Sequence, residues 1–113
     1  MHISEHEQHC VKKLGAPFTK IHGFLDQYFD QTPGPVHRVI LHHRLGIEFG
    51  IAKFGESARE ALELHVLDDF EFIPDTPLEV AQMMVDQDFL SLHEINVLQP
   101  ILDSLWPGRF KLS

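Results

Sequence analysis

The sequence has a single cysteine, few basic residues and no long hydrophobic run. Cys10 has no partner within the chain, so an internal disulfide is excluded and nothing indicates an oxidising compartment. The nine Lys and Arg residues are scattered, and the formal net charge is -8 at pH 7. Phosphate backbones and anionic membrane surfaces are held by clustered basic side chains, so we expect no nucleic-acid partner and no membrane partner.

Signals for export or membrane insertion are also missing from the sequence. No window approaches the roughly 18 consecutive apolar residues that a membrane-spanning helix needs. The first ten residues, MHISEHEQHC, are polar and acidic, without the cationic start and apolar stretch of a secretory signal. We therefore expect a cytoplasmic protein. With 113 residues, 43% of them hydrophobic, the chain is long enough for one domain, 1–113, with a packed core.

Four places in the chain carry a signal for the start of a helix, a Ser or Thr followed three residues later by Glu. In such a capping box the hydroxyl and the carboxylate each accept a backbone N–H that the first turn leaves unpaired. The pairs are Ser4 with Glu7, Ser57 with Glu60, Thr76 with Glu79 and Ser91 with Glu94. No segment alternates convincingly like a strand, so we predict an all-α fold, a compact bundle of five to six short helices.

Glycine and proline residues separate the predicted helices. The expected helices are 4–14, a short one within 18–30, a central one over 36–50, then 57–69, 77–89 and a last one from Ser91. Pro100 lies inside the last helix, where it removes a hydrogen bond and clashes with the preceding turn. We therefore predict a kink or break near residues 96–99.

The central segment, VHRVILHHRLGIEFG at 36–50, places one histidine on an apolar face. At about 100° per residue its apolar residues fall within one arc, with His43 near the centre. The members of this arc are Val36, Val39, Ile40, His43, Ile47 and Gly50. Two further segments repeat the pattern of one histidine in an apolar stripe, with His22 and His65. We expect all three imidazoles to point into the core.

Carboxylates lie one helical turn after two of these histidines. Asp69 follows His65 by four residues, and Asp26 follows His22 by four. A carboxylate in this position either ligates the same ion or holds the second imidazole nitrogen. In the first helix, His6 and Cys10 form another pair with this spacing.

Imidazoles and a carboxylate that converge from several helices are typical of metal centres in helical bundles. We predict that His22, His43 and His65 meet in the interior, with His6 and Asp69 close by, around a divalent ion such as zinc or iron. Such an ion would support a hydrolytic or oxidative metalloenzyme acting on a small molecule. No known catalytic motif is present, so whether the protein is an enzyme stays open at this point.

Other interpretations of the histidines remain. A single histidine on an apolar face is more often a neutral core residue, although burying three together without a shared partner is costly. The protein would then be a non-enzymatic interaction or regulatory module, a homodimer that buries Trp106 and Phe110. A third hypothesis is a pH sensor. Of the histidines off the apolar stripes, we expect His37 to be solvated or paired. His42, at the edge of the stripe, would support a metal ligand from behind. His2, His9 and His93 are expected on the surface.

The order and spacing of these residues resemble a family of small histidine-rich bacterial and phage helical proteins. The matches are His6, Lys13 with Gly15, Ile21-His22, His37-Arg38, His42-His43, Gly46-Ile47, Phe54-Gly55, His65 with Asp69, and Ile73-Pro74. Where the family has Asp after the His22 position this chain has Gly23, and Ala16 replaces a second glycine. The resemblance implies that the histidines belong together, which supports a metal site, and it implies no particular activity.

Overall fold

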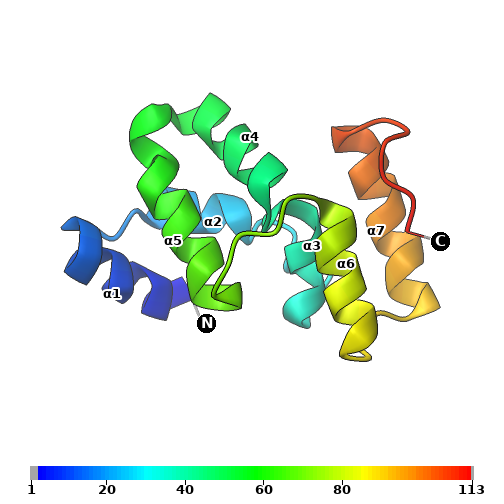
Figure 1. The fold of residues 1–113 in the computed structure, drawn as a ribbon. Coiled ribbons are helices and arrows are strands. Elements are labelled where there is room, and N and C mark those ends of the chain that lie inside the picture. Colours follow the sequence, from blue (N-terminus) through cyan, green and yellow to red (C-terminus); the bar gives the residue numbers. More distant parts are fainter. Residues whose placement is uncertain (1–2, 113) are drawn as a thin grey trace.

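The computed structural model describes residues 3–112, which form helices, turns and loops without any strand. The described part contains seven α-helices and two short 3₁₀ helices, drawn in Figure 1. Its principal extents are 41 × 26 × 23 Å. The predicted all-α class is confirmed, whereas the predicted number of five to six helices is too low.

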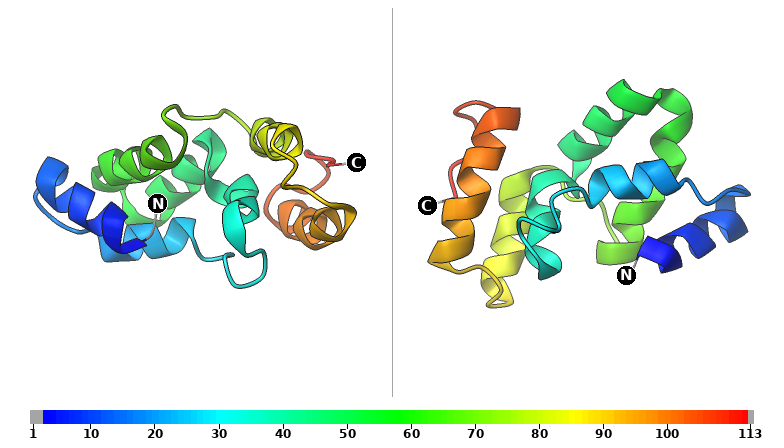
Figure 2. Two further views of the ribbon diagram at one scale, coloured as in Figure 1. Left: turned by 90° about the horizontal axis from the view of Figure 1, so that it is seen from below. Right: turned by 180° about the vertical axis from the view of Figure 1, so that it is seen from behind.

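The helices form two groups that lie side by side along the longest dimension of the molecule (Figures 1 and 2). One group packs α1 against α2 and α5, and α4 against α5 and α2. The other packs the short α3 against α6 and α7. In chain order the elements are α1 (Ile3–Leu14), α2 (Thr19–Leu25), η1 (Gly34–His37), α3 (Arg38–Leu41), α4 (Arg44–Phe54), η2 (Glu56–Ala58), α5 (Arg59–Phe70), α6 (Pro77–Asp86) and α7 (Leu92–Leu105).

The predicted central helix over 36–50 is wrong, because the chain turns sharply between α3 and α4. His43 has an extended backbone (φ -159°, ψ 178°) and caps α4, its Nδ1 atom accepting a hydrogen bond from the Gly46 N–H at 3.2 Å. A Cβ atom on Gly46 would lie 1.9 Å from the Leu41 carbonyl oxygen, so this close turn requires glycine. The helical arc assumed for residues 36–50 therefore does not continue past Leu41.

Two of the four predicted helix caps are present. Thr76 and Ser91 each accept a hydrogen bond from the backbone N–H three residues on, and Ser91 forms the complete capping box. Ser4 instead lies inside α1, whose described part starts at Ile3. Ser57 lies in η2, and α5 starts after it without a side-chain cap. A short 3₁₀ turn thus replaces the expected cap.

The C-terminal segment folds back onto the core. The sequence predicts a kink or break near 96–99, and α7 is continuous through Pro100, so the helix does not break there. Trp106 and Phe110 are only 8% and 6% exposed and pack edge to face. The expectation that they are exposed and become buried in a dimer is wrong, because this chain itself covers them. Within residues 3–112, no helix combines the length and apolar character needed to traverse a lipid bilayer.

Candidate metal centre

Four histidines from different parts of the chain come together in the interior of the first helix group. Each of the four is 0% exposed. Two aspartates, one just after α2 and one in the last turn of α5, complete the cluster. The six residues are His6, His22, Asp26, His42, His65 and Asp69. Buried imidazoles and carboxylates need partners, so the contacts among these side chains decide what the cluster does.

Part of the cluster, the Asp–His group, consists of Asp26, His42, His65 and Asp69. The Nε2 atoms of His42 and His65 face each other at 3.1 Å. His42 Nε2 lies 3.2 Å from Asp69 Oδ2 and 3.4 Å from Asp26 Oδ1. His65 Nε2 lies 3.4 Å from the same Asp26 atom and 3.6 Å from the same Asp69 atom. Each carboxylate thus places one oxygen near both imidazole nitrogens.

These spacings are compatible with the ligand set of a metal ion. Three of the five distances are 3.4 to 3.6 Å, longer than the usual range for nitrogen to oxygen hydrogen bonds. Ligand atoms around a tetrahedral zinc ion, with bonds of about 2.0 to 2.2 Å, lie roughly 3.3 to 3.6 Å from one another. Asp26, His42 and His65 each offer one ligand atom within 4.8 Å of the others, and Asp69 Oδ2 lies near both nitrogens, so these side chains could hold a divalent ion.

A second set, the three-histidine group, consists of His6, His22 and His65. One ring nitrogen from each lies within 4.8 Å of the others. The Nδ1 atoms of His22 and His65 are 2.7 Å apart, and the His6 ring stacks on His65 with centroids 3.7 Å apart. His65 belongs to both groups, because its Nδ1 faces His22 while its Nε2 faces His42.

Side chains around the cluster hold the donor groups in place. His37 contacts the Gly34 carbonyl oxygen through Nδ1 at 2.6 Å and Asp26 Oδ1 through Nε2 at 3.0 Å. Arg38 Nη2 donates to Asp69 Oδ1 at 3.3 Å. Such outer contacts fix the orientation of ligating side chains in metal sites.

Both carboxylates of the Asp–His group are held in the ionised form. Burial by itself would raise the pKa of Asp26, but hydrogen bonds from neighbouring imidazoles, first of all His37, outweigh it and hold that pKa well below its usual range. Burial opposes ionisation of Asp69 in the same way, and its contacts with the imidazoles of His42 and His6 outweigh burial and hold its pKa well below the usual range. Two negative charges therefore face the interior at neutral pH.

The histidines between these carboxylates differ in protonation. Burial lowers the pKa of His65 to about 3, so its ring is neutral at pH 7 and keeps one nitrogen lone pair. Burial, aided by the neighbouring His6, also lowers the pKa of His22. Burial disfavours the charged form of His42 too, yet Asp26 and Asp69 raise its pKa above the usual value. The two carboxylates thus favour positive charge at His42.

The structure brings together four of the five predicted metal ligands. His6, His22, His65 and Asp69 all belong to the cluster. His43 does not converge with them, which corrects the prediction. Its Nε2–H donates to the Ile40 carbonyl oxygen at 2.7 Å, its Nδ1 caps α4, and its ring packs against Trp106. The turn before α4 accounts for the difference, since it directs His43 away from α5.

Three residues that form or support the cluster were not among the predicted ligands: His42, Asp26 and His37. His42 adjoins His43, and Asp26 lies four residues after His22. His37, expected to be solvated or paired, is buried and paired with Asp26.

The three histidines expected on the surface have different outcomes. His9 is half-buried and contacts Asp68 at 2.7 Å. His93 is exposed as predicted. His2 lies outside the described residues.

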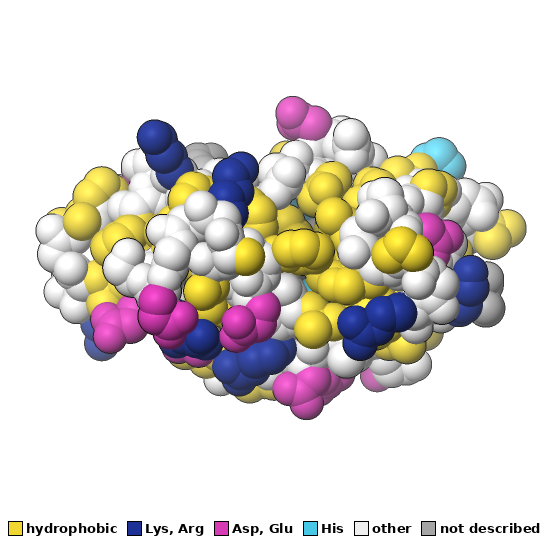
Figure 3. All heavy atoms as spheres, turned by 90° about the horizontal axis from the view of Figure 1, so that it is seen from above, with side chains coloured by type: hydrophobic (Ala, Val, Ile, Leu, Met, Phe, Trp, Pro, Cys, Tyr) yellow, Lys and Arg dark blue, Asp and Glu magenta, His cyan; other side chains and the backbone are white. Residues whose placement is uncertain are grey.

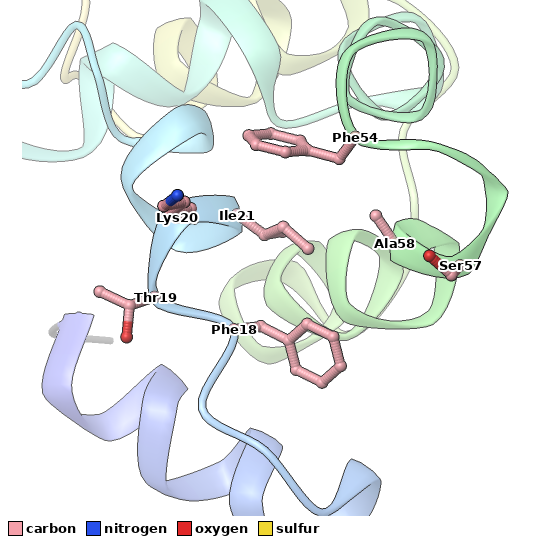
Figure 4. Close-up of a pocket in the computed structure, with 7 residues that line it drawn as sticks. All are labelled: Phe18, Thr19, Lys20, Ile21, Phe54, Ser57 and Ala58. Atoms are coloured by element: carbon pink, nitrogen blue, oxygen red, sulfur yellow. The ribbon is translucent and has the colours of Figure 1, made fainter.

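An apolar pocket of about 350 Å³ lies apart from the histidine and aspartate cluster, between α2 and the turn that leads into α5. Phe18 and Phe54 flank Ile21 in its wall, with Ala58 opposite (Figure 4). None of the cluster's histidines or aspartates lines it. This pocket is therefore not the entrance to the candidate metal centre.

Comparisons with known proteins do not place the chain in a family. No protein-family model, no curated protein and no solved structure matches it. The resemblance to small histidine-rich bacterial and phage proteins stays a prediction. The geometry of the cluster is therefore the main indication of function.

Proposed function

We propose that the protein binds a divalent metal ion, zinc or iron, between Asp26, His42, His65 and Asp69. The observation that carries the proposal is the set of five distances, 3.1 to 3.6 Å, that join the two Nε2 atoms to each other and to the two carboxylates. Mixed imidazole and carboxylate donors suit both metals.

Charge supports the same proposal. Asp26 and Asp69 together carry two negative charges. Arg38 pairs with Asp69 at 3.3 Å, and burying the remaining charge is costly unless another cation compensates it. The Asp69 side chain is only 2% exposed. A divalent ion balances the two carboxylates when the imidazoles that share it are neutral.

The chemistry that fits this site is hydrolytic or oxidative, on a small-molecule substrate. A bound divalent ion would supply Lewis acidity toward water or a substrate oxygen. The Asp26 side chain is 21% exposed, while those of His42 and His65 are fully buried. A substrate would therefore approach from the Asp26 side, where His37 also lies.

Metal analysis of the untagged protein tests the proposal. After growth with added zinc and iron, we expect about one or more equivalents of metal per chain by mass spectrometry of the digested protein. A double variant, Asp26→Asn with His42→Ala, should lose this metal. The control His93→Ala removes an exposed histidine and should keep it. Less than a few tenths of an equivalent in the supplemented wild type would refute metal binding.

A second candidate function, an interaction module that forms a homodimer, is favoured by exposed apolar side chains near the α6–α7 connection. Val85, Phe89 and Leu92 are 51%, 47% and 71% exposed. Figure 3 shows other hydrophobic side chains spread over the upper face of the molecule, where histidine covers little area. Light scattering at high concentration tests this function. A dimer that Leu92→Glu dissociates would support it, and a strict monomer would exclude the dimer.

A further inference from the structure

The three-histidine group is a second cluster of metal-ligating atoms beside the first. We infer that His6, His22 and His65 hold a second divalent cation, so that the loaded protein carries a two-metal centre. This inference rests on the proposed function, because the second ion would share His65 with the first. Its geometric basis is that one nitrogen from each ring lies within 4.8 Å of the other two.

His6 provides the strongest observation for a second ion. Its side chain is 0% exposed, and neither of its ring nitrogens makes a hydrogen bond within residues 3–112. The closest carboxylate oxygens, on Asp69 and Asp68, lie 3.4 and 3.6 Å away. Charge-assisted hydrogen bonds are shorter, about 2.7 to 2.9 Å. A buried imidazole without partners is costly, and a coordinated cation would remove that cost.

The orientation of His22 would let its Nδ1 atom coordinate the same ion. Its Nε2 atom lies 3.2 Å from Cys10 Sγ, so a proton on Nε2 can be donated to the sulfur. That tautomer leaves the lone pair on Nδ1, which faces His65 Nδ1 at 2.7 Å. Two neutral rings satisfy so short a contact only with a proton between the two nitrogens. A cation bound to both nitrogens would replace that proton, which leaves to solvent.

Asp69 and His65 link the two groups. Asp69 Oδ2 faces His42 at 3.2 Å, and its other oxygen, Oδ1, faces His6 at 3.4 Å. A carboxylate with one oxygen toward each group can contact two ions at once. His65 likewise has one nitrogen on each side. Its use by both ions at once would require the ring to release its remaining proton to solvent.

Counting ions in the intact protein tests the inference. Protein stripped with a chelator is titrated with Zn²⁺ or Co²⁺, and native mass spectrometry gives the number of ions per chain. We expect two ions for the wild type and two for the control His93→Gln. His6→Gln and His22→Gln should each bind one ion, because the Asp–His group stays intact in both.

The outcomes separate this inference from the proposed function. One ion in the wild type, unchanged in His6→Gln, would overturn the second site and leave the first standing. No ion in the wild type would overturn both. His6→Gln binding none would show that the six side chains form one site, and binding two would show that His6 is not a ligand. Either result overturns the inference.

A measurement on the wild type alone covers the case in which the variants do not fold. With excess Mn²⁺, two ions that share Asp69 or His65 should give an exchange-coupled electron paramagnetic resonance spectrum. A spectrum of isolated bound Mn²⁺ only would overturn the inference.

Discussion

The Nε2 atoms of His42 and His65 face each other at 3.1 Å, although 23 residues separate them in the chain. Asp26 and Asp69 each bring one oxygen to within 3.2 to 3.6 Å of both nitrogens. Two imidazoles and two carboxylates therefore converge in an interior that excludes water from the rings. This convergence is the basis of the metal-binding proposal and of the predictions below.

His65→Ala should abolish metal binding altogether, because His65 is the one member shared by the Asp–His group and the three-histidine group. We expect its metal content to fall to the background of a protein without a site. His93→Ala, which removes a histidine on the surface of α7, should match the wild type. Elemental analysis after supplementation measures both, and wild-type metal content in His65→Ala would contradict the assignment.

His43→Ala should destabilise the fold without changing the number of bound ions. The substitution removes the cap of α4 and the packing against Trp106, which we expect to cost about 1 to 3 kcal/mol in the free energy of unfolding. Urea denaturation of the metal-free protein measures the loss. His43→Asn keeps a side-chain acceptor and should recover part of it. A variant that folds but loses its metal would show that His43 is a ligand after all.

Gly46→Ala should be severely destabilising, whereas Gly23→Ala should be tolerated. The added Cβ at Gly46 would overlap the Leu41 carbonyl, and that at Gly23 meets nothing within 4 Å. Gly23 lies within α2, so alanine there should stabilise the helix by up to about 1 kcal/mol. Thermal unfolding followed by circular dichroism compares the two. Equal midpoints would show that the turn before α4 has another geometry.

Removal of the metal should lower the thermal stability of the protein. An ion present at about 100 times its dissociation constant adds roughly 2.7 kcal/mol to the free energy of unfolding. For a domain of this size that corresponds to a midpoint shift of about 10 to 20 °C. Differential scanning fluorimetry with and without a chelator measures the shift. The Asp26→Asn, His42→Ala double variant should show a smaller shift, because only the three-histidine group stays intact in it, and a shift of wild-type size would place the ion elsewhere.

Local sequence signals predicted several elements correctly. α1 ends at Leu14, directly before Gly15, which adopts a positive φ of 85°. α6 and α7 begin directly after the caps formed by Thr76 and Ser91. These boundaries depend on hydrogen bonds between residues a few positions apart, so they can be predicted without knowledge of the tertiary structure.

The break in the central segment could not be predicted from such local signals. The pattern of apolar residues over 36–50 is compatible with one helix, and His43 then points to the core. The turn depends instead on the Gly46 backbone packing against Leu41. It sends His42 into the cluster and leaves His43 as the cap of α4. A helical wheel assumes a constant rotation per residue, and a single turn of this kind invalidates it for the residues beyond.

The sequence by itself determined an all-helical chain with an excess of histidine on apolar stripes, because helix periodicity and capping are local properties of the chain. Only the tertiary structure decided which imidazoles meet. Convergence requires side chains from α1, α2 and α5 and from the turn before α4 to approach a common point. That approach depends on how the helices pack and on one sharp turn, neither of which a periodic pattern contains.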